Sequence, residues 1–185
     1  TMFMNWVRQG RLQLPEEEIE AQMFDETIEA MEKKGRHQYE VSNFALTGKE
    51  SQHNLAYWNN DHYYGFGAGA SGYLGQTRYK NHGPIQHYLK PLRENHLPIV
   101  ETEELTRLNQ IEEELFLGLR KKVGISKQKF QQKFHEPIEA IYGEVIQRLI
   151  KEELLIEEAD ILRLTKKGLF VGNNVFEAFL LSEKE

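Results

Sequence analysis

The chain has 185 residues, of which 39% are hydrophobic and 28% are charged, so we expect one large or two small globular domains rather than a disordered chain. The net charge of −6 argues against a nucleic-acid partner, because a phosphate backbone requires a basic face. The absence of cysteine excludes disulfides, zinc–thiolate sites, thiol nucleophiles and cysteine-bound iron–sulfur clusters within these residues.

No segment of the sequence predicts a membrane anchor or a secretion signal. No apolar run approaches the ~20 residues that a membrane helix needs. The opening stretch, TMFMNWVRQGRLQLPEEE, has too short an apolar core for a signal peptide and continues at once into acidic residues. We therefore expect a cytoplasmic protein. The chain lacks an initiator methionine, which suggests a fragment of a longer protein.

The first hundred residues combine helical and extended patterns. Apolar residues at steps of three to four predict a helix over residues 16–34, which Gly35 ends, and we expect its apolar face to cover a sheet. Further along, the pattern predicts a strand over 37–44, a loop with one helical turn over 51–60, an extended segment over 64–74, a short strand over 77–81 and a helix from Pro84.

Beyond residue 100, glycine is scarce and helical periodicity is strong. Helices are predicted over 102–121, with Thr102 as the cap, and over 126–134 and 137–151. Two apolar stretches, 154–157 and 161–164, flank a short turn and predict a hairpin, and a closing helix follows Gly168. We therefore expect an α/β domain over residues 1–100 and a mainly helical, winged-helix-like domain over residues 101–185.

Residues 39–83 are the candidate site region, because glycine, aromatic residues, Asn and His are densest there. The stretch GFGAGAS at 65–71 lacks the spacing and the following helix of a dinucleotide-binding fingerprint. Its bare backbone either lets a flat ligand lie close or lets another chain segment pack closely. The sequence leaves both interpretations open.

The motif HNLAYW at 53–58 is the second candidate. It puts the imidazole of His53 beside Asn54, Tyr57 and Trp58, and such residues can ligate a metal or stack on a planar ligand. From residue types alone, a histidine that is simply hydrogen-bonded in a loop is the more frequent outcome. The other histidines form no spaced ligand set, so we predict no metal site.

The sequence identifies no catalytic residue. The acidic clusters lie on helix faces with Lys and Arg nearby, and no serine lies in a nucleophile-elbow pattern. A winged-helix outline raises the question of DNA binding. However, the segment before the hairpin is acidic, with Glu139, Glu144, Glu152 and Glu153 opposed only by Arg148 and Lys151.

Four motifs in order resemble one family. YEVSNFA (39–45), HNLAYW (53–58), GFGAGASGYL (65–74) and RYKN (78–81) are similar to the C-terminal half of the oxygen-independent coproporphyrinogen III oxidase-like proteins of the radical S-adenosylmethionine superfamily. LTKKG (164–168) resembles the end of that family's C-terminal domain. The resemblance implies the last units of an open (β/α) barrel, a partial barrel remnant, followed by the winged-helix-like domain.

Within this family, HNLAYW is similar to the branch regarded as heme chaperones, which bind heme and pass it to acceptor proteins. The resemblance implies heme or porphyrin as the ligand, an acceptor protein as a partner, and His53 as a heme contact with Asn54, Tyr57 and Trp58 around it. It also matches five positions near the S-adenosylmethionine pocket of the oxidase branch, namely Ala45, Gly67, Gly69, Ala70 and Ser71.

The lack of cysteine is a departure from the family. The motif that holds the [4Fe–4S] cluster would precede residue 1, so we expect this fragment to be inactive alone, and whether the parent is an enzyme stays open. Two alternatives remain: an oxidase that decarboxylates coproporphyrinogen III to protoporphyrinogen IX, and a C-terminal protein-interaction module. A half barrel exposes sheet edges, so a homodimer also stays open.

Overall fold

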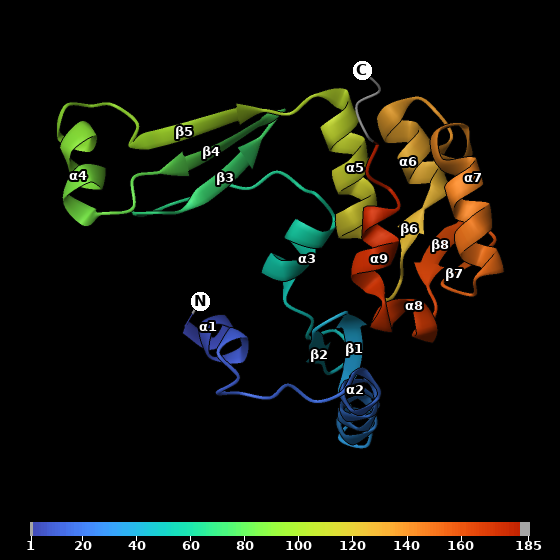
Figure 1. Ribbon diagram of the computed structural model, residues 1–185. Helices are drawn as coiled ribbons and strands as arrows, with labels where there is room; N and C mark the ends of the chain where they lie inside the picture. The colour runs from blue at the N-terminus through green and yellow to red at the C-terminus, as the bar shows by residue number, and fades with distance from the viewer. Residues whose placement is uncertain (1, 182–185) are drawn as a thin grey trace.

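The computed structural model describes residues 2–181, which form an extended N-terminal part and a compact C-terminal part (Figure 1). The N-terminal part contains two separate small sheets, and the C-terminal part is a compact bundle around a third. Along the first part the elements are α1 (Met2–Arg8), α2 (Glu17–Glu32), β1 (His37–Glu40), β2 (Asn43–Ala45), α3 (Gln52–Trp58), β3 (Ser71–Leu74), β4 (Thr77–Asn81), α4 (Ile85–Arg93) and β5 (Ile99–Glu104).

The C-terminal part has the predicted winged-helix-like order. Its elements are α5 (Arg107–Gly118), β6 (Ile125–Ser126), α6 (Lys127–Phe134), α7 (Ile138–Lys151), β7 (Leu155–Glu158), β8 (Ile161–Leu164), α8 (Lys166–Phe170) and α9 (Gly172–Glu177). The three strands form an antiparallel sheet in the order β6–β8–β7. The expected mixed α and β class with this C-terminal domain is therefore confirmed.

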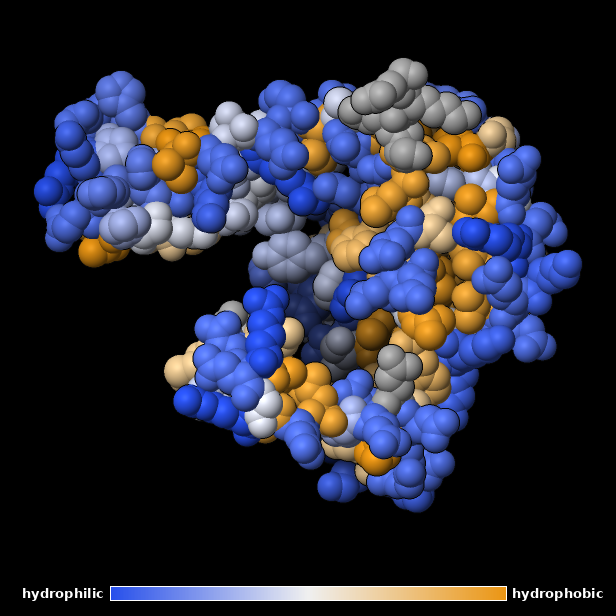
Figure 2. Space-filling view, viewed as in Figure 1, coloured by the Kyte–Doolittle hydropathy of each residue, from blue (hydrophilic) through white to orange (hydrophobic). Residues whose placement is uncertain are grey.

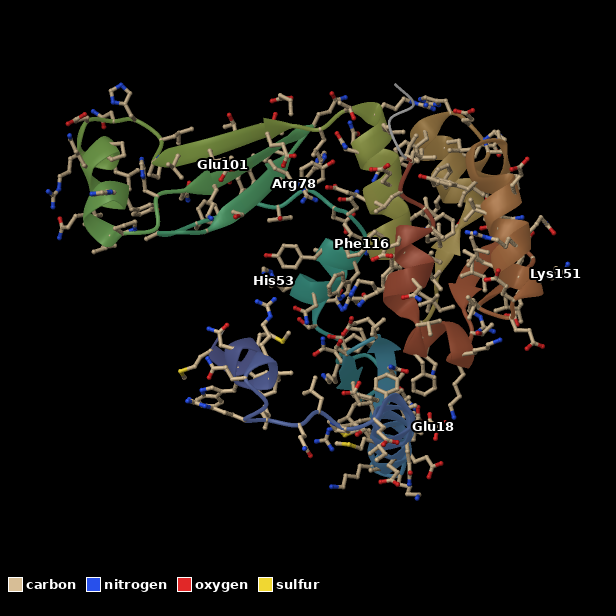
Figure 3. All side chains as sticks on the ribbon, in the orientation of Figure 1. Glu18, His53, Arg78, Glu101, Phe116 and Lys151 are labelled. Atoms are coloured by element: carbon tan, nitrogen blue, oxygen red, sulfur yellow. The ribbon has the colours of Figure 1, made fainter. Side chains whose placement is uncertain are left out.

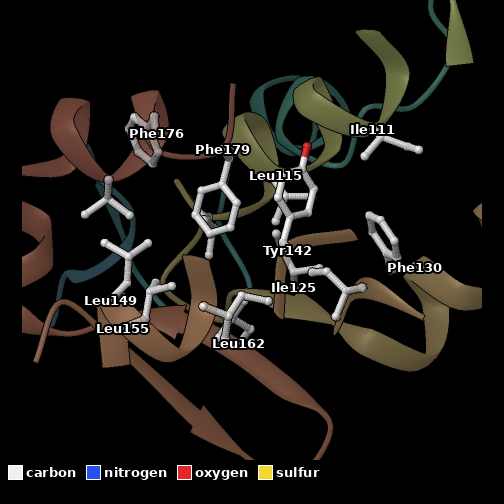
Figure 4. Packing of buried hydrophobic residues seen from close by; sticks show 14 of the residues in the cluster. Ile111, Leu115, Ile125, Phe130, Tyr142, Leu149, Leu155, Leu162, Phe176 and Phe179 are labelled. Atoms are coloured by element: carbon white, nitrogen blue, oxygen red, sulfur yellow. The ribbon is translucent and has the colours of Figure 1, made fainter. Parts of the chain in front are cut away.

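Nearly all of the apolar core lies in the C-terminal part (Figure 4). Leu115 of α5, Leu162 of β8 and Val175 of α9 have no exposed surface, and each such burial contributes about 2 kcal/mol. Gly118 allows α5 to approach β6, because a Cβ there would lie 2.5 Å from the side chain of Ile125. This domain supplies the rigid base of the molecule.

In contrast to the C-terminal part, the N-terminal part buries more polar than hydrophobic side chains. Among its described residues, Tyr73 is the one buried hydrophobic side chain, whereas four polar side chains are buried: Gln38, Glu40, Asn60 and Asn81. Its two sheets are antiparallel, the hairpin β1–β2 and the set β3–β4–β5, and neither closes into a barrel within residues 2–181. The set β3–β4–β5 with α4, here called the arm, extends to one side (Figure 1).

Several expected elements are confirmed and several are wrong. The helix over 16–34, the strand over 77–81, the helix after Pro84 and the hairpin before α8 are present. The single strand over 37–44 is a hairpin that turns at Val41 and Ser42, and residues 51–60 contain the two-turn helix α3. The apolar face of α2 is only partly covered, since Ile19 and Met23 are about half exposed.

The helix predicted from residue 102 begins five residues later. Glu103 of β5 pairs with Arg78 of β4, so this stretch belongs to the arm, and a capping box between Thr106 and Asn109 starts α5. The expected domain boundary near residue 100 falls inside β5. We therefore propose a boundary after Glu104. Among residues 2–181, no helix is long and apolar enough to cross a membrane.

A buried ion pair joins the two parts. The Glu40 side chain is fully buried; its Oε1 accepts hydrogen bonds from the Ser42 backbone and from the Asn43 amide, and its Oε2 lies 3.8 Å from Arg120 Nη2. The Arg120 guanidinium lies 4.6 Å from the ring centroid of Trp58. Two backbone hydrogen bonds, from Val41 to Arg120 and from Lys122 to Tyr39, hold β1 against this segment. These contacts therefore hold β1, α3 and the segment that follows α5 next to one another.

We expect Glu40→Gln to lower the free energy of unfolding by about 2–3 kcal/mol, because Gln keeps the acceptor for Ser42 but leaves the Arg120 charge without its carboxylate. Urea unfolding of the chain measures this. The matched control is Glu29→Gln, since Glu29 also lies 3.8 Å from its partner, Lys33, but on the exposed face of α2. The control should cost less than about 0.5 kcal/mol. Equal costs for the two variants would contradict the role given to Glu40.

Candidate functional site

Helix α3 presents His53. Ser51 caps the helix by accepting a hydrogen bond from the Asn54 backbone, and the four-residue spacing places His53 and Tyr57 on one face. Their rings lie 4.8 Å apart, edge to face. The His53 side chain is exposed, and neither ring nitrogen has a hydrogen-bond partner among residues 2–181. An imidazole in this state has a nitrogen available for a ligand.

The aromatic contacts continue from α3 into the arm. The Tyr57 ring lies 4.5 Å from that of Tyr63, again edge to face, and the Tyr63 backbone pairs with Tyr73 of β3. Burial raises the pKa of both the Tyr63 and the Tyr73 hydroxyl, and only the nearby Arg78 charge acts in the opposite direction among the larger causes. These two tyrosines are therefore neutral aromatic supports near pH 7 and not phenolate ligands.

The other two predicted residues of HNLAYW face the protein. The Asn54 side chain donates a long hydrogen bond of 3.5 Å to the Tyr39 hydroxyl. Trp58 is half-buried beneath Arg120, and its Nε1 is buried without a partner among the described residues. The motif therefore divides into two roles: His53 and Tyr57 form the outward face, and Asn54 and Trp58 attach α3 to β1 and α5.

The outward face of α3 borders a concave region of the molecule. Figure 2 shows the surface hollowed between the arm and the segment that carries α1 and α2. In Figure 3, His53 projects from α3 toward this open side, whereas Phe116 and Lys151 belong to the C-terminal domain. The predicted residue His53 is thus placed where a ligand larger than a single ion has access.

The glycine-rich loop before β3 is built by packing. A Cβ at Gly65 would lie 2.3 Å from the Ser71 carbonyl oxygen, and one at Gly72 would lie 2.2 Å from the Tyr79 ring. The Tyr79 hydroxyl accepts a hydrogen bond from the Gly65 backbone, and the buried Asn81 amide donates to the carbonyls of Gly65 and Gly67. Of the two interpretations left open by the sequence, close packing accounts for Gly65 and Gly72.

The predicted S-adenosylmethionine positions do not come together. Ala45 ends the β1–β2 hairpin, whereas Gly67, Gly69, Ala70 and Ser71 lie in the arm, and Figure 1 shows these sheets apart. The backbone N–H groups of Gly67 and Gly69 are already used, by the Tyr88 hydroxyl and the His82 carbonyl. Within residues 2–181, the loop therefore offers few free donors for a charged cofactor.

Metal ligands are also scarce. The sequence has no cysteine, so it cannot supply thiolates to an iron–sulfur cluster. Among the described residues, no group of three His, Asp or Glu side chains is arranged to hold a metal ion.

Sequence reasoning missed the residues that hold the arm in place. Arg78 donates a hydrogen bond of 2.8 Å to Glu113 of α5, and burial raises the pKa of that carboxyl while Arg78 opposes the shift. Tyr79, Asn81 and Tyr88 hold the glycine loop. Arg78, Tyr79 and Asn81 lie within RYKN, which served only as a marker of resemblance, so their contacts were not foreseen.

Comparison with known proteins identifies the family of this chain. Residues 105–171 match the sequence model of the HemN C-terminal domain, which covers α5 through α8. The chain is 49% identical over 185 residues to a protein named heme chaperone HemW from Lactococcus lactis and 46% identical over 180 residues to one of the same name from Bacillus subtilis. This chain belongs to the HemW family.

The matches to these two HemW proteins cover 99% and 97% of this chain but 48% of each relative. The chain thus spans about half the length of the curated relatives it matches. A solved structure, coproporphyrinogen III oxidase (HemN) from Escherichia coli, described as a radical SAM enzyme, matches with a TM-score of 0.68 and 17% identity, over 90% of this chain and 42% of that one. At this identity the likeness shows a shared fold.

We expect Gly72→Ala to lower the free energy of unfolding by about 1–3 kcal/mol, because the new methyl group displaces the Tyr79 ring and weakens its hydrogen bond to Gly65. Gly83→Ala is the matched control, since a Cβ there meets no atom within 4 Å, and it should be neutral or slightly stabilising. Denaturant unfolding of the two variants makes the comparison. A neutral Gly72→Ala would refute the packing role of this glycine.

Proposed function

We propose that this chain is the C-terminal half of a heme chaperone and that the outward face of α3 contributes to heme binding. The observation that carries the proposal is the 49% identity to a protein named heme chaperone HemW over 99% of the chain. The exposed, unpartnered imidazole of His53 supports it from the geometry. Transfer of heme to an acceptor protein belongs to the same proposal and rests on the names of these relatives.

The residues of α3 suit an iron porphyrin as cargo. A histidine nitrogen is a common axial ligand of heme iron, and His53 has no hydrogen bond to the described residues 2–181 that would have to break first. The edge of the Tyr57 ring against His53 restricts rotation of the imidazole, and Tyr57 adds an aromatic surface for a flat macrocycle. Ser51, which caps α3, and Trp58, which is held by Arg120, position this helix from its two ends.

The cluster and S-adenosylmethionine are proposed for the whole protein only. The likeness to HemN-type proteins implies both, but this chain lacks thiolates, and Ala45 lies apart from the glycine loop. No step of the proposal passes through either group. The likeness to the Escherichia coli oxidase is a likeness of fold, so it does not favour the oxidase alternative for this chain.

We expect hemin titration of the chain to give a saturable shift of the Soret band, and His53→Ala to weaken hemin binding by about tenfold or more and to change the band position, because the axial imidazole is lost. Absorption spectroscopy measures both. His96→Ala is the matched control, since His96 is also exposed but follows α4 at the far end of the arm. If His53→Ala and the wild type bind hemin alike, the assignment of His53 fails.

A further inference from the structure

A cavity of about 450 Å³ lies between the end of α3 and the start of the C-terminal domain. It is separate from the outward face of α3, because its walls come from the residues after Trp58, from the end of α5 and from β6 and α6. Five lining residues with donor groups carry the argument: Asn59, Asn60, Lys121, Lys129 and Lys133.

The charges around the cavity are positive in balance. Three ammonium groups face two carboxylates, those of Asp61 and Glu114. Lys133 is paired with Glu114 at 2.6 Å, and Lys121 donates to the Asn59 side-chain oxygen at 2.7 Å. The Lys129 ammonium group makes no hydrogen bond or ion pair within residues 2–181, although its charge acts on the Asp160 carboxylate nearby. A cationic cavity in a chain of net charge −6 indicates a local requirement for an anion.

Two further features of the lining favour a ligand that is anionic and accepts hydrogen bonds. The pKa of Lys121 is lowered, first because burial disfavours its charge, and the nearby Lys129 and Lys133 act in the same direction against Glu114 and Asp61. Asn60 has an exposed fraction of only 6%, and its Nδ2 has no hydrogen-bond partner in the described part of the chain. A buried amide donor without an acceptor costs free energy that a ligand oxygen would recover.

We propose that this cavity binds the phosphate group of a small phosphorylated molecule. Lysine ammonium groups act as point charges for phosphate, and the side-chain amide N–H groups of Asn59 and Asn60 are suitable neutral donors beside them. The volume lies within the usual range for small-molecule sites and exceeds what a single phosphate ion fills. The ligand is therefore a phosphate ester rather than free phosphate.

The test is isothermal titration of the full chain with inorganic phosphate and with glycerol 3-phosphate, at constant ionic strength set with sodium chloride. We expect saturable binding of both, about 1 mM or tighter for the ester. Lys129→Gln should weaken binding by about fivefold or more, because an unpaired charge is removed. Lys129→Arg, which keeps the charge, should remain within about threefold of the wild type.

Lys151→Gln is the matched control, because Lys151 is an exposed lysine at the end of α7, away from the cavity (Figure 3). It should leave binding unchanged. Tighter binding of the ester than of phosphate supports the proposal, and tighter binding of phosphate would overturn the assignment to a phosphate ester. The absence of saturable binding, or an equal loss in Lys129→Gln and Lys151→Gln, would overturn the proposal. Thermal melting confirms that each variant is folded.

Discussion

The contact of Glu40 with Arg120, and of Arg120 with Trp58, is the constraint on which the N-terminal part depends. That part has almost no apolar core, so hydrophobic burial alone does not orient its sheets and helices. A buried charge must be paired, and this requirement selects one arrangement of β1, α3 and the end of α5. The outward direction of His53 follows from this arrangement, because Trp58 holds the opposite face of the same helix.

The C-terminal domain serves as the fixed base for both candidate binding regions. Its own core is dense, with α5, β8 and α9 contributing fully buried side chains. The arm is fastened to this base through Arg78 and Glu113, and α3 through Arg120 and Lys121. A molecule bound at the outward face of α3 and one bound in the lysine-lined cavity would therefore both contact segments that are attached to α5. The two sites share one support but present different chemistry, an aromatic face with an imidazole and a cavity of ammonium groups.

Local patterns predicted the elements whose partners are close in sequence. The periodicity over α2 and α7, the hairpin β7–β8 and the winged-helix-like order were all recognisable before the fold was known. The start of α5 was misplaced because Thr102 and Glu103 have good helix-starting chemistry, yet β4 recruits them as a strand through pairing with Tyr79 and Arg78. Only one turn was expected where α3 has two, because the support of this helix is distant: Arg120 lies more than sixty positions along the chain from Trp58.

By itself, the sequence determined the α/β class, the family and the lack of thiolate ligands, and it marked HNLAYW and the glycine-rich stretch as the candidate site region. Only the tertiary structure decided which members of those motifs face outward. In the folded chain, Asn54 and Trp58 face the protein, and Gly65 and Gly72 allow close packing. Ala45 lies apart from the glycine loop. The fold also brings three lysines around one cavity, namely Lys121, Lys129 and Lys133. The reason is physical. Propensity and periodicity act over a few residues, whereas the contacts of buried charges and buried amides are made between residues that are distant in sequence and are set only by the folded chain.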